Sequence, residues 1–326
     1  MKDQIYKELA LSIDLEKSRI SKFPSLIFLC GGPFKNNDNE FKSCREIFFR
    51  HISETQKFEF RKNIILAEDI FNYFSHSSYT DLITFEEDIA ELSALTVVFS
   101  ESPGAIAELG TFAVLKQVQE RLLVIINEED AEQESFIWRG PALYLKNKAK
   151  ENDKDDPISI YKWPKLKNDD DLLKKSDFSD ADDLSELIQK VLDNTPKTSL
   201  FNKDHAGHVM LLIVDLLNIL KLATVDEMHA ILNSLGIECK HKTIQQKLSL
   251  LCSLKYVRRK PYRHNTFYLA NIDDLWLSLA FKKDARTNDL YRWSAMFADY
   301  YNEENKQKSR ALRSFMTANN PNGNQT

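Results

Sequence analysis

The sequence has few cysteines and no long uninterrupted hydrophobic run. Its cysteines are Cys30, Cys44, Cys239 and Cys252. They form no CxxC pair and no cysteine–histidine cluster at zinc spacing, which argues against a disulfide framework and against a structural metal site. No apolar run approaches the roughly 18 to 20 residues that span a bilayer, and the charged and polar start of the chain has no signal-peptide core. We therefore expect a cytoplasmic protein with buried free thiols, no metal and no membrane association.

Several common catalytic signatures are also missing. The sequence has no GxGxxG loop, no Walker motif, no GxSxG nucleophile elbow and no HExxH zinc motif. What remains is a chain of 326 residues, 43% of them hydrophobic, which is long enough for two domains with separate cores. Its formal net charge of −5 is mild, and such a balance can hide local asymmetry.

The first part of the chain alternates short apolar runs with helical patterns. The expected strands are 25–29, 63–67, 95–99, 122–126 and 158–163, and the expected helices are 39–56, 69–74, 84–93, 105–120 and 181–192. This alternation is typical of a parallel sheet with helices on both faces. Right-handed crossovers and short loops then predict a flavodoxin-like or Rossmann-like α/β fold. We assign residues 1–195 to this domain.

Beyond Pro196 the pattern changes to helices followed by a hairpin. The expected helices are 208–222, 224–235 and 243–254, and two strands are expected within 256–269. A capping box, Thr224-Val225-Asp226-Glu227, marks the start of the second helix. Three helices and a two-stranded wing predict a winged-helix domain over 196–316, which also contains two further expected helices, 271–281 and 287–301. Residues 317–326 are expected to form a disordered tail.

The predicted wing is strongly basic. From Gly236 to Leu269 the sequence has eight lysines and arginines against the single acid Glu238, a local charge of +7. Such a patch is expected for contact with a nucleic-acid backbone, and the interleaved Tyr262 and His264 are suited to stacking on unpaired bases. Winged helices also serve as protein–protein modules, so that alternative stays open. The predicted nucleic-acid contacts are Lys247, Arg258, Arg259, Lys260 and Arg263.

The run from Phe99 to Phe112 is the most informative part of the first domain. It joins an apolar strand to a helix through Pro103-Gly104 and places Glu108 about one turn inside that helix. The free N–H groups and the dipole of such a helix favour an anion, and open α/β sheets bind ligands at this edge. The dipole alone also favours a glutamate near a helix start. The neighbouring strand and turn nevertheless make Glu108 a candidate catalytic carboxylate.

Small and acidic residues follow the neighbouring strands as well. A Gly-Gly pair follows the first strand, Glu68 and Asp69 close the second, and Glu86 precedes the third. Because the carboxyl ends of parallel strands meet at one edge of a sheet, we expect these residues to converge there. The acids that could assist Glu108 are Glu68, Asp69 and Glu86, which the sequence does not rank. The predicted substrate-binding residues are Cys30, Gly31, Gly32, Ser102, Pro103 and Gly104.

Clustered carboxylates without a metal motif fit the cleavage of an N-glycosidic bond. That reaction passes through an oxocarbenium-like transition state, which an anionic glutamate stabilises as a nucleophile or as a nearby charge. We assign this role to Glu108. A second acid then orients a sugar hydroxyl or protonates the departing base. The alternative is a non-catalytic nucleic-acid-binding regulator whose α/β domain senses a nucleotide.

The same residues resemble a known family. The segments Ile27-Phe28-Leu29-Cys30-Gly31-Gly32, Ala67-Glu68-Asp69-Ile70-Phe71 and Glu101-Ser102-Pro103-Gly104 with Glu108-Leu109-Gly110, followed by a winged helix, are similar to the nucleoside deoxyribosyltransferase-like effectors of bacterial retrons. The resemblance covers roughly residues 20–300. It implies a toxin of antiphage defence, an N-glycosidase that uses NAD or a related nucleotide as substrate and needs no cofactor.

The resemblance also implies partners, and the sequence differs from the family at one position. It implies control by a complex of the retron reverse transcriptase with its multicopy single-stranded DNA and RNA, and it implies a homo-oligomer, because related transferases complete their active sites across subunit contacts. Nucleoside deoxyribosyltransferases usually have an aspartate six residues before the nucleophile to bind the base, whereas this chain has Ser102 there, preceded by Glu101. This difference favours water over a second base as the acceptor.

Overall fold

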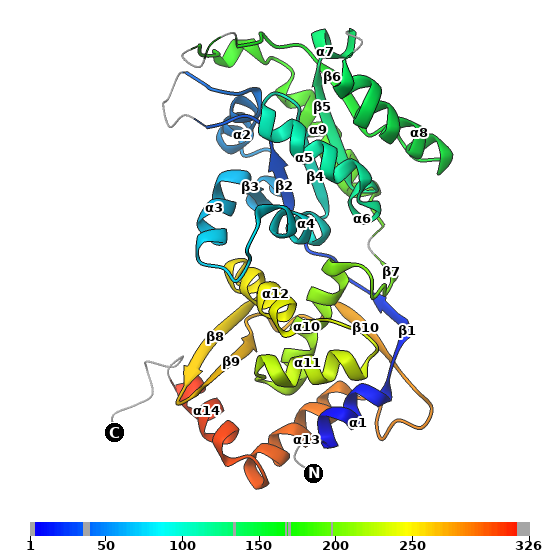
Figure 1. Ribbon diagram of the computed structural model, residues 1–326, viewed down its shortest axis with the longest axis vertical. Helices are drawn as coiled ribbons and strands as arrows, with labels where there is room; N and C mark the ends of the chain where they lie inside the picture. Colours follow the sequence, from blue (N-terminus) through cyan, green and yellow to red (C-terminus); the bar gives the residue numbers. More distant parts are fainter. Residues whose placement is uncertain are drawn as a thin grey trace. The chain divides into compact units, whose positions relative to one another are not determined.

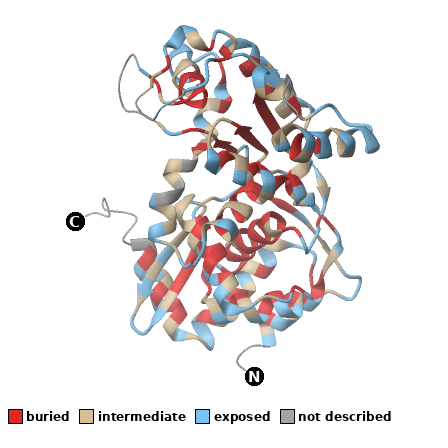
Figure 2. Ribbon diagram, turned by 45° about the horizontal axis from the view of Figure 1, so that its top comes forward, coloured by how far each residue is buried: buried red, intermediate tan, exposed pale blue. Residues whose placement is uncertain are grey.

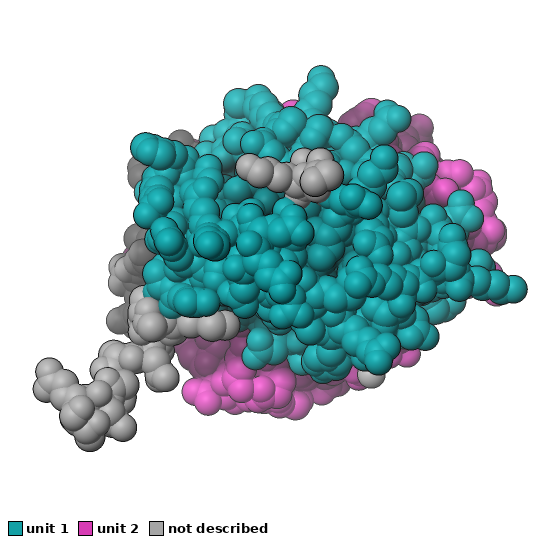
Figure 3. Space-filling model, turned by 90° about the horizontal axis from the view of Figure 1, so that it is seen from below, with its two compact units in different colours: residues 1–23, 73–82, 197–326 teal, residues 24–72, 83–196 magenta. Residues whose placement is uncertain are grey.

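The protein is described from a computed structural model, which defines residues 4–34, 40–132, 135–166, 168, 171–196 and 198–317. The chain divides into two compact units, coloured separately in Figure 3. Unit 1 contains residues 1–23, 73–82 and 197–326, and unit 2 contains residues 24–72 and 83–196. These units differ from the predicted domains 1–195 and 196–316, because the N-terminal 23 residues and the segment 73–82 group with the C-terminal part of the chain.

Unit 2 is built on a five-stranded parallel sheet. Its strands are β2 (Ile27–Cys30), β3 (Ile64–Leu66), β4 (Leu95–Phe99), β5 (Leu122–Asn127) and β6 (Ile158–Tyr161). They lie in the order β3-β2-β4-β5-β6, and every neighbouring pair is parallel. Numbered along the chain this order is 2-1-3-4-5, the flavodoxin-like arrangement. The predicted α/β fold with a parallel sheet is therefore confirmed.

The sheet of unit 2 is buried because apolar side chains project from both of its faces and pack against helices. Every residue of β2, β4 and β5 is buried. On one face, Leu29 and Phe99 belong to a cluster with α2 (Cys44–Thr55) and α9 (Ala181–Asn194). On the other face, Phe28 meets Phe112 of α5 (Pro103–Val114), with 6.0 Å between the ring centroids. Figure 2 shows these strands as buried.

Shorter helices complete unit 2 (Figure 1). They are α3 (Ala67–Ser75, whose last residues fall in unit 1), α4 (Leu82–Leu92), α6 (Lys116–Gln119), α7 (Glu128–Glu132) and α8 (Leu143–Glu151). A 3₁₀ turn, η1 (Glu59–Asn63), leads into β3, and one π-helical turn, η2 (Trp138–Ala142), leads into α8. Another 3₁₀ turn, η3 (Lys175–Asp177), precedes α9.

Unit 1 contains the predicted succession of three helices and a hairpin. The helices are α10 (Ala206–Leu220), α11 (Val225–Ser234) and α12 (His241–Ser253), and the hairpin is β8 (Val257–Tyr262) with β9 (Asn265–Ala270). The capping box is confirmed: Thr224 Oγ1 accepts from the N–H of Glu227 at 3.3 Å, and the N–H of Thr224 donates to Glu227 Oε2 at 2.8 Å. A short antiparallel bridge joins Ala223 to Tyr268 of β9.

Unit 1 joins the N-terminal elements of the described chain to a strand from its C-terminal part. Helix α1 (Gln4–Ser12) leads into β1 (Ile13–Ile20), which pairs with β10 (Leu277–Phe281) on one side and β7 (Ser199–Leu200) on the other. The helix predicted at 271–281 is therefore wrong, because this segment ends in β10. Its strand form is stabilised from outside, since the buried Asp215 carboxylate of α10 accepts from the N–H groups of Trp276 and Leu277.

Two helices follow β10. Helix α13 (Leu290–Glu303) corresponds to the helix predicted at 287–301, and α14 (Lys306–Thr317) was not predicted. Of the predicted tail 317–326, only Thr317 lies within the described residues, as the last residue of α14. Among the described residues, no helix has the length and hydropathy of a membrane span.

Candidate functional site

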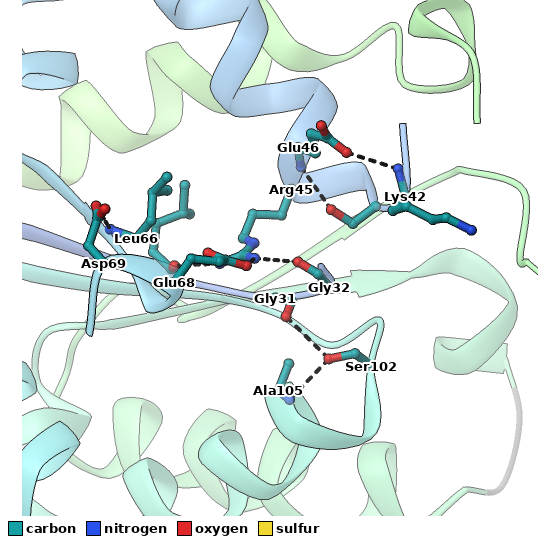
Figure 4. A network of polar contacts seen from close by, with 12 residues as sticks. Gly31, Gly32, Lys42, Arg45, Glu46, Leu66, Glu68, Asp69, Ser102 and Ala105 are labelled. Atoms are coloured by element: carbon teal, nitrogen blue, oxygen red, sulfur yellow. Dashed lines mark hydrogen bonds and ion pairs between the residues drawn. The ribbon is translucent and has the colours of Figure 1, made fainter. Parts of the chain in front are cut away.

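The candidate site of unit 2 lies at the carboxyl ends of β2 and β4. The chain passes from β2 to β3 on one side of β2, and it then returns to add β4, β5 and β6 on the other side. α/β sheets bind ligands at the point where the direction of the connections reverses, which here lies between β2 and β4. The turn at Gly31 and Gly32 follows β2, and Glu101 and Ser102 follow β4. Figure 4 shows the polar contacts around these turns.

Glu101 is a structural carboxylate at the start of α2. Its Oε1 accepts from the N–H groups of Gly32 and Arg45, both at 3.0 Å, and its Oε2 accepts from the N–H of Cys44 at 2.6 Å. Burial raises the pKa of Glu101, and these three N–H donors oppose the shift. Since helix N-termini attract anions, Glu101 occupies the place that a phosphate takes in many α/β proteins. The sequence did not predict that Glu101 would occupy the start of α2.

The start of α5 also has fewer free N–H groups for an anion than the sequence suggests. Ser102 caps the helix: its Oγ accepts from the N–H of Ala105 and donates to the carbonyl of Gly31, both at 3.2 Å (Figure 4). Pro103 has no N–H to offer. Of these first helical residues, Gly104 retains its N–H and has open space around its Cα. Among residues 103–105, the N–H of Gly104 therefore remains as the donor for a phosphate.

The Gly-Gly pair is explained by packing against α2. A Cβ atom at Gly31 would lie 2.8 Å from Cδ of Arg45, and one at Gly32 would lie 2.6 Å from Cβ of Ser43. Both distances are too short for any side chain to be tolerated without movement. The glycines therefore let the turn approach α2 closely, which brings Arg45 beneath the site.

Glu108 faces two other predicted site residues. The thiol of the buried Cys30, at the end of β2, is hydrogen-bonded to the Glu108 carboxylate. Glu86 of α4 is close enough to Glu108 for the charge of Glu108 to raise the pKa of Glu86. Burial raises the pKa of Glu86 to about 7, and the charge of Glu108 adds to the shift. Burial also raises the pKa of Glu108, while the Cys30 thiol and the positive Arg45 oppose that rise.

Arg45 ties Glu68 to this cluster. Its guanidinium is buried and donates to the carbonyl of Leu29 at 3.0 Å, to the carbonyl of Gly32 and to Glu68 Oε1. The ring of Phe34 lies 4.7 Å from the guanidinium carbon. Sequence reasoning missed Arg45, because nothing in its position within a helical pattern distinguishes it from a solvated arginine.

Asp69 does not join the cluster. Its Oδ2 accepts from the N–H of Leu66 at 3.3 Å, so it faces the start of α3 while Glu68 points toward Arg45 (Figure 4). The second oxygens of Glu68 and Glu108 are both buried and have no hydrogen-bond partner within the described residues. Buried polar atoms are normally satisfied, which distinguishes these two oxygens from the carboxylate oxygens of Glu101. The structure therefore brings together Cys30, Glu68, Glu86 and Glu108.

The predicted basic residues of unit 1 fall into three groups. Lys247, one of the predicted nucleic-acid contacts, lies on α12 with 8% of its surface exposed. Along β8, Arg258 and Lys260 share one side and line a cavity with Phe315, whereas Arg259 points to the other side and is exposed. Arg263 is exposed at the tip of the hairpin, 5.7 Å above the ring of Tyr262.

Comparison with known proteins identifies the class. Residues 41–259 match the family described as STM3845 retron effector protein. This match covers more than half of the 326 residues, so the protein belongs to this family of retron effectors. The matched region includes Glu68, Glu86 and Glu108.

Two curated relatives come from Escherichia coli. One is named "Retron Ec73 putative ribosyltransferase/DNA-binding protein" and is 29% identical over 133 residues, 39% of this chain and 40% of the relative. The other carries the corresponding name for retron Ec86 and is 28% identical over 121 residues, 37% of each chain. The chain thus spans about two fifths of the length of the curated relatives it matches.

Proposed function

We propose that this retron effector is a toxin of antiphage defence that cleaves the N-glycosidic bond of NAD or a related nucleotide. The observation that supports this most strongly is the Glu108 carboxylate, which is held by the Cys30 thiol, lies near Glu86 and keeps one buried oxygen without a partner. Its position at the β2–β4 edge is where such a fold binds its ligand. The ribosyltransferase names of the relatives agree with glycosyl chemistry.

The proposed reaction has two steps. Glu108 attacks the anomeric carbon, so a carbon–oxygen bond forms while the glycosidic carbon–nitrogen bond breaks and its electron pair leaves with the base. Nicotinamide leaves NAD as a neutral base and takes no proton. Water then attacks the same carbon, gives its proton to Glu86 and releases the sugar and the Glu108 carboxylate.

We assign supporting roles in this reaction to the residues around Glu108. The Cys30 thiol and the charge of Arg45 favour the ionised form of Glu108, which a nucleophile requires. The free oxygen of Glu68 is available to a sugar hydroxyl. Glu101 makes no contribution of this kind, because both of its oxygens bind backbone N–H groups.

The direct test is the release of free base from a nucleotide panel. The purified full chain is incubated with NAD, nucleoside monophosphates and deoxynucleotides, and chromatography detects the bases. Release from one of these classes supports the proposal and identifies the substrate. Tight binding of a nucleotide without any release contradicts it and favours the non-catalytic regulator.

Glu86 should give the reaction a pH dependence. Because burial raises its pKa to about 7, Glu86 changes from acid to carboxylate near neutrality, and only the carboxylate accepts a proton from water. We expect the hydrolysis rate to rise with pH through about 7. Glu86→Gln should lose this rise and about 10²-fold or more in rate, the usual contribution of a general base. The neighbouring Glu87→Gln is the matched control, and a Glu86→Gln profile identical to the wild type would remove the residue from the mechanism.

We further propose that α10–α12 and the β8–β9 hairpin form a winged-helix module. Through it the effector contacts the complex of the retron reverse transcriptase with its multicopy single-stranded DNA and RNA, and this complex controls the toxin. The exposed Arg259 and Arg263 and the neighbouring Tyr262 support a nucleic-acid contact. The DNA-binding names of the relatives agree with it.

Charge reversal of the hairpin tests this contact. Arg259→Glu with Arg263→Glu should abolish association with the purified reverse transcriptase–DNA complex, because exposed cations become repulsive to phosphates. The matched control is Lys148→Glu with Lys150→Glu on α8, which changes the net charge equally. Gel filtration measures the complex and circular dichroism the fold. Equal binding by the hairpin and control variants would exclude the hairpin as the interface.

A further inference from the structure

One short stretch of the chain groups with the other unit than its neighbours in sequence. Residues 73–82, the linking segment, belong to unit 1, whereas residues 24–72 before it and 83–196 after it form unit 2. The linking segment contains the end of α3 and the first residue of α4. Because the backbone is continuous, both helices pass from one unit into the other.

Helix α12 of unit 1 contacts the linking segment at two points. Ser249 Oγ accepts from the N–H of Ser78 at 3.2 Å, and Lys242 Nζ donates to Thr80 Oγ1 at 3.3 Å. Between these two contacts in the sequence, Tyr79 is buried, with 6% of its surface exposed. The linking segment is therefore docked on α12 and is not a free surface loop.

Both contacts lie on one face of α12. Lys242 and Ser249 are about two helical turns apart, and Gln246 lies between them on the same face. The buried Ile244 and Leu248 lie on the opposite side of the helix. Gln246 has only 8% of its surface exposed, although polar residues on the outer face of a helix are usually exposed. Its burial agrees with cover of this face by the linking segment.

The linking segment is also bonded internally. Ser77 Oγ accepts from the N–H of Tyr79 at 3.2 Å and donates to the carbonyl of Phe74 at 2.8 Å, and the N–H of Ser77 donates to the same carbonyl at 3.0 Å. These bonds connect the last turn of α3 with the residues that meet α12. A displacement of α12 is therefore passed along the segment rather than absorbed by it.

The linking segment leads directly into the helix that carries Glu86. Helix α4 begins at Leu82, and Glu86 lies four residues later, about 6 Å along the helix axis. Over one turn a helix moves as a rigid element. Glu86 in turn lies close to Glu108. A shift of the first turn of α4 therefore changes the place of the Glu86 carboxylate relative to Glu108.

We propose that α12 positions Glu86 through the linking segment, with Lys242 and Ser249 as the positioning residues. This inference rests on the proposed function, in which Glu86 accepts the proton of the attacking water. Neither positioning residue takes part in the chemistry. The arrangement gives unit 1 control over the second step of the reaction, because a change at α12 displaces Glu86 and leaves Glu108 able to attack the sugar.

The kinetic test uses the full chain and the nucleotide from which it releases base. Lys242→Ala with Ser249→Ala removes both hydrogen bonds to the linking segment. We expect kcat and KM to fall together by about tenfold, because only the hydrolysis of the glycosyl–enzyme intermediate slows, and small misplacements of a catalytic group can cost up to about 100-fold. The ratio kcat/KM should stay unchanged, and an initial burst of released base should appear. Lys242→Arg with Ser249→Thr keeps both bonds and should restore the wild-type values.

A measurement without nucleotide tests the positioning separately from the reaction. Amide hydrogen exchange is followed in peptides that cover residues 76–81 and α4. The double alanine variant should exchange about fivefold faster or more in both regions, because each lost hydrogen bond lowers the free energy of local opening. Lys150→Ala with Ser234→Ala makes the same changes at exposed positions of α8 and α11 and should behave as the wild type in both experiments.

The outcomes distinguish this inference from the proposed function. Faster exchange confined to residues 76–81, with α4 unchanged, would overturn the positioning role. So would a fall in kcat/KM at constant KM, which places the effect on the first step, or kinetics identical to the wild type. A wild-type chain that releases no base contradicts the proposed function alone, and faster exchange in α4 would then still support its positioning by α12.

Discussion

Glu108→Gln is expected to reduce the release of free base by about 10³-fold or more, because a neutral amide neither attacks the anomeric carbon nor stabilises a positive sugar. The amide keeps the size of the side chain and its ability to accept from the Cys30 thiol, so the packing around β2 should persist. Chromatographic assay of released base measures the effect. Overexpression of the variant should no longer arrest growth.

The control for this prediction is Glu120→Gln, which removes an exposed carboxylate at the end of α6. It should retain wild-type activity. A Glu108→Gln variant that folds, melts at the wild-type temperature and still releases base would show that Glu108 is not the nucleophile. In that case the unpartnered oxygen of Glu68 would mark the next carboxylate to replace.

Arg45→Met is expected to produce the largest loss of stability, about 3 kcal/mol in the free energy of unfolding. The methionine fills part of the volume but leaves the carbonyls of Leu29 and Gly32 without their donor, and it leaves Glu68 without its cation. Urea unfolding of the full chain, followed by circular dichroism, measures the difference in unit 2.

Two further variants separate charge from geometry at this position. Arg45→Lys keeps the charge but has no planar fork to reach two carbonyls and a carboxylate, so it should recover only part of the lost stability. Arg310→Met replaces an exposed arginine on α14 and should change the free energy of unfolding by less than about 0.5 kcal/mol. Equal stability of Arg45→Met and the wild type would contradict the assigned role.

Much of the fold was predictable because its signals are local. The buried strand 95–99 is both apolar and β-branched, and it appears as β4 with the same bounds. The capping box at Thr224 fixed the start of α11 for the same reason, since both partners lie within four residues. In these places short-range pattern and tertiary packing favour the same structure.

The segments that escaped prediction depend on distant partners. The apolar residues of 271–281 fit a helix as well as a strand, and β10 forms because β1 and Asp215 supply its hydrogen bonds. Lys247 was predicted from its charge as a nucleic-acid contact, yet only 8% of its surface is exposed. Periodicity gives the spacing of residues along an element but does not say which side the rest of the chain will cover.

In the candidate site, some features also follow from local sequence and others from tertiary contacts. The sequence by itself determined the parallel sheet, the placement of Glu108 after β4 and the concentration of positive charge around the hairpin, because each depends on residues close together in the chain. Only the tertiary structure decided that Glu101 fills the start of α2, that Arg45 binds Glu68, and that Asp69 faces away. Those outcomes depend on hydrogen bonds between elements brought together by the sheet, and the directions of side chains across such contacts are not encoded in local spacing.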